Sequence, residues 1–324
     1  MCSMSSLSPV GARAVCVVRD AALRRTLRRT LNAAGSTVEF FETLDPTSEV
    51  PSLVFVDGDA CRSAMPALRQ IVAEGGKIVV LGESLEDNEI VALLRAQPLD
   101  HLISDTGAPD EVELVVTSVK LLKGDIFGLE KYLAWGVKLY EKEVASYVGK
   151  RDALRSITDH AKTIGARRKV VARIENVADE LLMNALYDAP GVEHGGTANE
   201  RIRAAVEGTD GARPALLRYG SDGRYFALSV TDQYGTLHKS VILDNLMRAR
   251  NESGRPRSDD SSGAGLGIYF ILSSVTRFIA NIDPDKTSEV ICMFDLRQNS
   301  REIGSCTRSL HFFTTDNSLP HEAA

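Results

Sequence analysis

Between residues 14 and 123 the sequence alternates short apolar runs with amphipathic segments, and this alternation constrains the fold more than any other feature. Four runs rich in Val, Ile and Leu are predicted strands: residues 14–18, 53–56, 78–81 and 99–104. Leu23, Leu27 and Leu31 recur every four residues and predict a helix between the first two strands. Strands that alternate with helices form a parallel sheet with helices on both faces. This part of the chain is therefore predicted to be α/β.

Acidic side chains follow two of these predicted strands. Asp57 comes directly after residues 53–56, and Asp20 comes shortly after residues 14–18. The carboxyl ends of parallel strands line the ligand crevice of such a sheet. The region resembles a response-regulator receiver domain, with Asp57 at the phosphoacceptor position and Asp20 at one of the acidic metal-binding positions. The resemblance implies a flavodoxin-like parallel sheet.

Three positions depart from the receiver pattern. Arg19 replaces a second acidic residue, Gly82 replaces a Ser or Thr, and Ser104 replaces the family's Lys. Phosphorylation of an aspartate needs a cation held by acidic neighbours, and the Lys then offsets the new charge. We therefore expect a degenerate receiver-like domain that docks partners without being phosphorylated, with Arg19 paired to one of the two carboxylates. The alternative is that Asp59 restores a carboxylate to the site.

Residues 172–190 predict a helix that ends at a proline. At about 100° per residue its apolar side chains form one broad stripe: Ile174, Val177, Ala178, Leu181, Leu182, Ala185 and Leu186. Glu180 and Asn184, one turn apart, project together near one border of this stripe. A carboxylate and an amide directed into one cleft suit a hydrated Mg²⁺ whose other ligands are phosphates. For this pair taken alone, a solvated helix face is the alternative.

Two later stretches carry acidic and glycine signals. Residues 225–232 alternate apolar and polar side chains like a strand and end in Asp232, with Gly235 in the following turn. A glycine-rich run then precedes an apolar segment that fits a helix, and it contains Gly263, Gly265, Leu266 and Gly267. Glycines at a helix start let backbone N–H groups approach an anion, which the helix N-terminus favours. This run is predicted to bind phosphate.

These stretches, in this order, resemble the motifs of the gyrase and histidine-kinase type of ATP-binding domain. The matches are Glu180-x-x-x-Asn184, Asp232-x-x-Gly235 and Gly263-x-Gly265-x-Gly267. The resemblance covers about residues 165–296 and implies a two-layer α/β sandwich that binds ATP and Mg²⁺. It implies that Asn184 binds the Mg²⁺ bridging the phosphates and that Glu180 orients or deprotonates the attacking group.

The same resemblance assigns the base-binding residues. Asp232 would accept a hydrogen bond from the adenine amino group, and Gly235 would let the backbone come close to the base. The glycine-rich run, with Leu266, would close over the phosphates. A later Ser or Thr of the family is matched by Ser288, with Thr287 as the alternative.

No acceptor-histidine hairpin directly precedes this region. Asp159 precedes His160 rather than following it, and only about one helix fits between His160 and Glu180, so a structural or solvated His160 is favoured. The arrangement is closer to the anti-sigma-factor type of serine kinase. We expect a signal-transduction protein, related to two-component systems, that transfers the ATP γ-phosphoryl group to a Ser or Thr of a partner protein. The alternatives are ATP hydrolysis that drives a conformational switch, and a non-catalytic adaptor that docks partners through the receiver-like domain.

The expected domains follow from these assignments. They are a disordered N-terminus (1–12), the degenerate receiver-like domain (13–123), a helical connector (124–165), the histidine-kinase-like ATP-binding domain (166–312) and a C-terminal tail (313–324). The connector either covers the edge of the receiver-like sheet or pairs with its copy in a homodimer. The sequence leaves both open.

Charge and composition exclude several classes of partner. The 324 residues carry a net charge of −6, so no basic face for nucleic acid is predicted. No run resembles a signal peptide or a membrane span, so we expect a cytoplasmic protein without a membrane partner. The five cysteines share no close spacing, which favours reduced, buried thiols over zinc ligands or disulfides.

Overall fold

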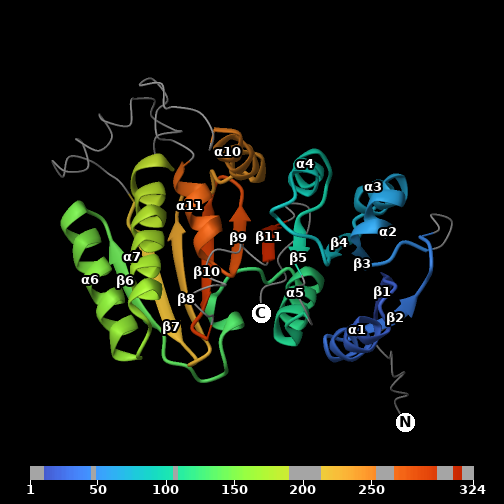
Figure 1. The fold of residues 1–324 in the computed structure, drawn as a ribbon, viewed down its shortest axis with the longest axis horizontal. Helices are drawn as coiled ribbons and strands as arrows, with labels where there is room; N and C mark the ends of the chain where they lie inside the picture. The colour runs from blue at the N-terminus through green and yellow to red at the C-terminus, as the bar shows by residue number, and fades with distance from the viewer. Residues whose placement is uncertain are drawn as a thin grey trace, which may run out of the picture. The chain divides into compact units, whose positions relative to one another are not determined.

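The computed structural model describes residues 11–44, 49–104, 109–189, 213–252, 266–297 and 309–315. The chain divides into two compact units. Unit 1 comprises Met1–Gly82 and Asp105–Asp125, and unit 2 comprises Glu83–Ser104 and Ile126–Ala324. Strands and helices build both units (Figure 1), which confirms the predicted α/β class.

Unit 1 is a parallel sheet with strand order β2–β1–β3–β4. The strands are β1 (Ala12–Val17), β2 (Ser36–Phe40), β3 (Leu53–Asp57) and β4 (Lys77–Leu81). The helices are α1 (Ala21–Ala33), α2 (Gly58–Ser63), α3 (Met65–Ala73) and α5 (Glu111–Lys123), and α1 packs against α5. Asp57 and Leu81 are register partners at the carboxyl ends of β3 and β4. The predicted parallel arrangement is confirmed, and β2 is an addition that the sequence did not predict.

Unit 2 contains a mixed sheet with strand order β5–β11–β9–β10–β8–β7–β6. Its strands are β5 (His101–Ile103), β6 (Tyr140–Val144), β7 (Ala215–Ser221), β8 (Tyr225–Asp232), β9 (Arg277–Asp283), β10 (Thr287–Asp295) and β11 (Ser309–Thr314). Neighbouring strands are antiparallel except β11 and β9, which are parallel. The strand latest in sequence therefore lies between two earlier ones.

The helices of unit 2 include the predicted central helix. They are α4 (Asn88–Ala96), the 3₁₀ turn η1 (Leu129–Tyr132), α6 (Tyr147–Thr163), α7 (Arg168–Met183), the π turn η2 (Asn184–Asp188), α10 (Lys239–Glu252) and α11 (Leu266–Ser274). α7 packs on β8 and β10 and also contacts α6 and α11. Its predicted apolar stripe is buried from Ile174 to Leu186. Figure 1 shows α6, α7 and α11 along one face of the sheet, a two-layer arrangement.

Residues 124–165 differ from the helical connector that their composition predicts. They include β6, which pairs with β7 from Tyr140 opposite Tyr219 to Val144 opposite Ala215. The helical parts are the short 3₁₀ turn η1 and α6, which packs against α7. The strand that pairs with β6 is distant in sequence, so the composition of residues 140–144 does not predict a strand there. The segment from Ile126 onward belongs to unit 2.

Residues Glu83–Ser104 also group with unit 2, although the expected boundaries place them in the receiver-like domain. Within unit 2, α4 packs against α10, and β5 pairs with β11. The chain therefore leaves unit 1 after Gly82, returns at Asp105 and leaves again after Asp125.

Thiols in the described part of the chain are buried. They are Cys16, Cys61 and Cys292. Burial raises the pKa of the Cys16 thiol to about 12. Burial also raises the pKa of the Cys292 thiol, so these two thiols form little of the reactive thiolate.

Candidate functional site

Glu180 and Asn184 lie where the central helix changes geometry. α7 ends at Met183, and the π turn η2 starts at Asn184, whose N–H donates to the Glu180 carbonyl. Both side chains are half-buried, whereas Leu181 and Leu182 beside them are buried. The pair therefore occupies the border of the apolar stripe. π turns within helices are frequent at functional sites.

The Glu180 side chain lies against the first turn of α11. A Cβ atom added at Gly267 would overlap the Glu180 carboxylate and lie 3.0 Å from its Cγ. In this conformation the carboxylate occupies the space that a side chain at residue 267 would take. The helix N-terminus also carries a partial positive charge that favours an acidic neighbour. The end of α7 and the start of α11 therefore meet at one place.

Asp232 is fixed by the turn that follows β8. Its Oδ1 accepts hydrogen bonds from the N–H groups of Tyr234 at 2.9 Å and Gly235 at 3.2 Å. Burial raises the pKa of the Asp232 carboxyl, and these hydrogen bonds offset part of that rise. The carboxylate is thus held rigidly at the end of its strand.

Ser288 is the register partner of Asp232 in the antiparallel pair of β8 and β10. It is buried, and its main-chain and side-chain contacts with the Asp232 carboxyl lower the pKa of that group. Thr287 instead donates from Oγ1 to the Asp232 carbonyl at 2.5 Å. An adenine edge offers an amino donor and a ring-nitrogen acceptor, so this carboxylate and hydroxyl fit it chemically.

Gly235 is required by the fold itself. Its φ is 65°, and an added Cβ would lie 2.7 Å from the Asp285 nitrogen and also contact Lys286 and Asp283. The Asp285 N–H donates to the Gly235 carbonyl at 3.3 Å. The turn after Asp232 is therefore packed against the turn between β9 and β10. The predicted approach of this backbone to the base stays a prediction.

The described site residues form two groups. Glu180 and Asn184 lie with Gly267, and Asp232 lies with Gly235 and Ser288. α7 packs on both β8 and β10 and against α11, which links the two groups. Gly263 and Gly265 lie outside the described residues, as does the side chain of Leu266.

The described ranges contain no set of three or more His, Cys, Asp or Glu side chains placed to hold a metal ion. A Mg²⁺ that takes phosphate ligands and water needs only one or two protein oxygens. The Asn184 amide is the predicted one. Nor does any helix within these ranges have the length and apolarity to cross a bilayer.

In unit 1, the two aspartates of the receiver-like pattern act as helix caps. Asp57 caps α2, with Oδ1 accepting from the Ala60 N–H at 2.9 Å and Oδ2 from the Arg19 N–H at 3.2 Å. Asp20 caps α1 through the Leu23 N–H at 2.6 Å. The Arg19 guanidinium pairs with Asp59 at 3.2 Å, not with either of these carboxylates. Arg19 therefore reaches Asp57 only through its main chain.

We predict that acetyl phosphate with Mg²⁺ leaves Asp57 unmodified, because both of its oxygens accept main-chain hydrogen bonds.

We also predict that Asp57→Ala lowers the free energy of unfolding by about 1 kcal/mol, because the substitution removes the N-cap of α2. Asp57→Asn is the matched control, since Asn caps helices equally well. Intact-mass spectrometry detects phosphorylation of Asp57, and calorimetry measures the free energy of unfolding. A stoichiometric phosphoryl adduct lost in Asp57→Asn would contradict the first.

His160 packs in an aromatic cluster. Its ring centroid lies 4.6 Å from that of Tyr140, 5.6 Å from Tyr219 and 6.0 Å from Phe226. Burial, and secondly Lys138, lower the pKa of His160. These contacts favour the structural interpretation of His160 over a phosphoacceptor.

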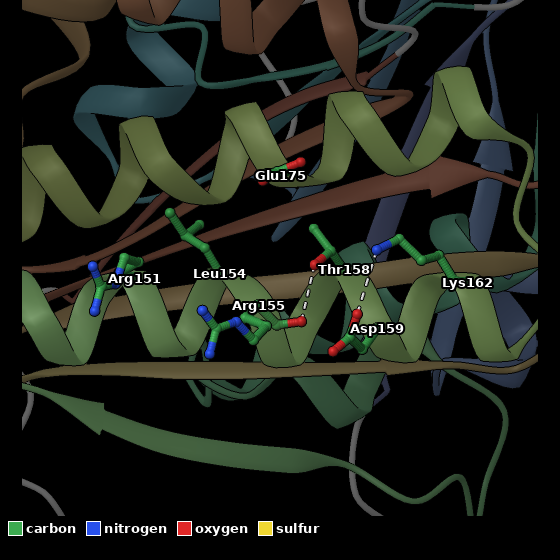
Figure 2. Close-up of a pocket in the computed structure, with 7 residues that line it drawn as sticks. All are labelled: Arg151, Leu154, Arg155, Thr158, Asp159, Lys162 and Glu175. Carbon is green, nitrogen blue, oxygen red and sulfur yellow. Dashed lines mark hydrogen bonds and ion pairs between the residues drawn. The ribbon is translucent and has the colours of Figure 1, made fainter.

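A groove between α6 and α7 was not predicted from the sequence. Its volume is about 430 Å³, and its lining residues are Arg151, Leu154, Arg155, Thr158, Asp159, Lys162 and Glu175. Figure 2 shows Glu175 on α7 across from the α6 side chains, with Lys162 paired to Asp159. Arg151 and Arg155 are one helical turn apart in the sequence, so the sequence alone places both of them on one face of α6. None of the predicted nucleotide-site residues lines this groove.

Comparisons with known proteins give no family. No family model matches the chain, and no curated protein matches it. The SiaB–SiaC complex from Pseudomonas aeruginosa is similar with 12% identity and a TM-score of 0.31, over 48% of this chain and 88% of that chain. Full-length FixJ from B. japonicum is similar with 11% identity and a TM-score of 0.27, over 61% of this chain and 91% of that chain.

Proposed function

We propose that this chain is an ATP·Mg²⁺-binding signalling protein that transfers the γ-phosphoryl group of ATP to a Ser or Thr of a partner protein. The observation that carries the proposal is the contact between Glu180 and Gly267. It joins the carboxylate proposed for catalysis to the helix start proposed to bind phosphate. A chance match of separate motifs would give no reason for these residues to meet.

Each group has a role in this proposal. Asp232 and Ser288 would bind the adenine edge, and the first turn of α11 would bind phosphate oxygens. Asn184 would hold Mg²⁺, which neutralises charge on the transferred group. These residues come from α7, the adjoining π turn, β8, β10 and α11, elements that pack on one another. Rigid elements of this kind position reacting groups well.

Glu180 would act on the acceptor hydroxyl. The hydroxyl oxygen bonds to the γ-phosphorus, the bond from that phosphorus to the β-phosphate oxygen breaks, and ADP leaves with the electron pair. Glu180 would accept the hydroxyl proton. Because its carboxylate lies at the start of α11, Glu180 would have to turn away as phosphate arrives there.

Calorimetric titration with a non-hydrolysable ATP analogue, with and without Mg²⁺, tests the proposal. We expect Mg²⁺ to tighten binding in the wild-type chain, and we expect Asn184→Ala to lose that tightening while still binding the Mg²⁺-free analogue. Arg155→Ala in the α6–α7 groove is the control and should bind like the wild type. Absence of analogue binding in either condition would refute the proposed function.

Incubation with γ-labelled ATP separates the proposed transfer from its alternatives. Label on Ser or Thr of an added partner protein supports transfer. Label released only as free phosphate would favour ATP hydrolysis coupled to a conformational switch. Binding without either product would favour an adaptor.

A further inference from the structure

α10 is held by the segment Glu83–Ser104, which contains α4 and β5. This segment groups with unit 2, while the residues on both sides of it in the chain belong to unit 1. α4 packs against α10. We call this segment the α4 brace. Its contacts with α10 lie at the beginning, middle and end of that helix.

The contact in the middle of α10 is a bidentate ion pair between Arg95 and Asp244. Arg95 Nε contacts Asp244 Oδ1, and Arg95 Nη2 donates to Asp244 Oδ2 at 3.1 Å. A guanidinium that meets both oxygens of a carboxylate fixes orientation as well as distance. α10 therefore cannot rotate about its axis without breaking this pair.

The other two contacts hold the ends of α10. Lys239, its first residue, donates to Asp100 Oδ1 at 2.7 Å and to the carbonyls of Gln97 and Leu99 at 3.2 and 3.3 Å. Near the other end, Arg250 donates to the Leu85 carbonyl and to Asn88 Oδ1, the latter at 3.2 Å. The α4 brace is thus hydrogen-bonded to α10 near both ends of that helix.

α10 leads by direct packing to the proposed nucleotide site. α10 packs against α11, and Gly267 in the first turn of α11 lies against Glu180. A shift of α10 would therefore reach the contact between Gly267 and Glu180, because packed helices move together rather than deform.

We propose that the α4 brace regulates the nucleotide site by setting the position of α10 and α11 relative to Glu180. This inference rests on the proposed function. The side chains of Arg95 and Asp244 are 45% and 41% exposed, and exposed ion pairs are individually weak, so the brace is a reversible restraint. The brace starts just after Leu81, the register partner of Asp57, so the chain itself connects it to the edge of the unit 1 sheet.

Charge reversal in the full-length chain tests the brace. The variants are Arg95→Asp, Asp244→Arg and the double reversal. We expect each single reversal to speed amide hydrogen exchange in α10 and α11 by about fivefold and to change the affinity for an ATP analogue by a similar factor. The double reversal should restore both. Arg29→Glu breaks an exposed ion pair with Glu111 in unit 1 and is the matched control, expected to change neither readout.

The two readouts distinguish failure of the brace from failure of the proposed function. Unchanged exchange in α11 after single reversal overturns the brace even when the chain binds nucleotide. Altered exchange with unchanged affinity in a nucleotide-binding chain also overturns it, because the contact would then be structural only. A wild-type chain that binds no nucleotide refutes the proposed function, and with it the regulatory role, while the exchange data still report whether α10 controls α11.

Discussion

Glu180→Gln is expected to bind ATP·Mg²⁺ no more weakly than the wild-type chain but to transfer the phosphoryl group about 100-fold more slowly or worse. Gln keeps the size of the side chain and its contact with Gly267, but it cannot accept the acceptor's proton. Its loss of charge also removes repulsion between the side chain and the phosphates. Calorimetry measures the affinity, and single-turnover transfer of γ-labelled phosphate measures the rate.

Glu175→Gln is the matched control for this experiment. Glu175 lies on the same helix but lines the groove against α6, away from the predicted nucleotide-site residues. This variant should match the wild type in affinity and in rate. Equal losses of rate in both variants, or an unimpaired Glu180→Gln, would count against a proton-accepting role for Glu180.

Gly235→Ala is expected to destabilise unit 2 by about 3 kcal/mol. The left-handed φ of 65° costs a non-glycine residue about 1 to 2 kcal/mol. The added Cβ would also press on the backbone of residues 283–286, and overpacking of this kind costs about 1 to 3 kcal/mol. Calorimetric unfolding of the full chain, with the transitions of the two units resolved, measures the change.

Gly223→Ala separates the two causes. Gly223 lies in the turn between β7 and β8 with a φ of 86°, and an added Cβ would meet no atom within 4 Å. Only the cost of the backbone conformation remains, about 1 kcal/mol. A Gly235→Ala variant no less stable than Gly223→Ala would show that the turn after Asp232 is not packed as described.

Helices and strands whose side chains follow a repeating pattern within one segment could be predicted from the sequence. The period of the apolar side chains predicted α7, because burial of one stripe leaves a local signature. The apolar runs predicted β1, β3 and β4 for the same reason. The border position of Glu180 and Asn184 followed from that stripe.

Contacts between segments that are distant in sequence could not be predicted from local patterns. Nothing local in residues 140–144 indicates that β7 is their partner, and the polar side chains of β6 resemble those of a solvated helix. Arg95, Lys239 and Arg250 join residues 83–104 to α10, but in the sequence they resemble ordinary surface charges. Which of Thr287 and Ser288 faces Asp232 is a matter of register, and register is set by strand pairing.

The place of β11 between β9 and β5 has a consequence for biosynthesis. Until residues 309–314 emerge from the ribosome, the edges of β9 and β5 that pair with β11 stay open. Unpaired strand edges attract other chains. The sheet is thus completed only once residues 309–314 have been synthesised, and a nascent chain stalled before this strand exposes both edges to aggregation.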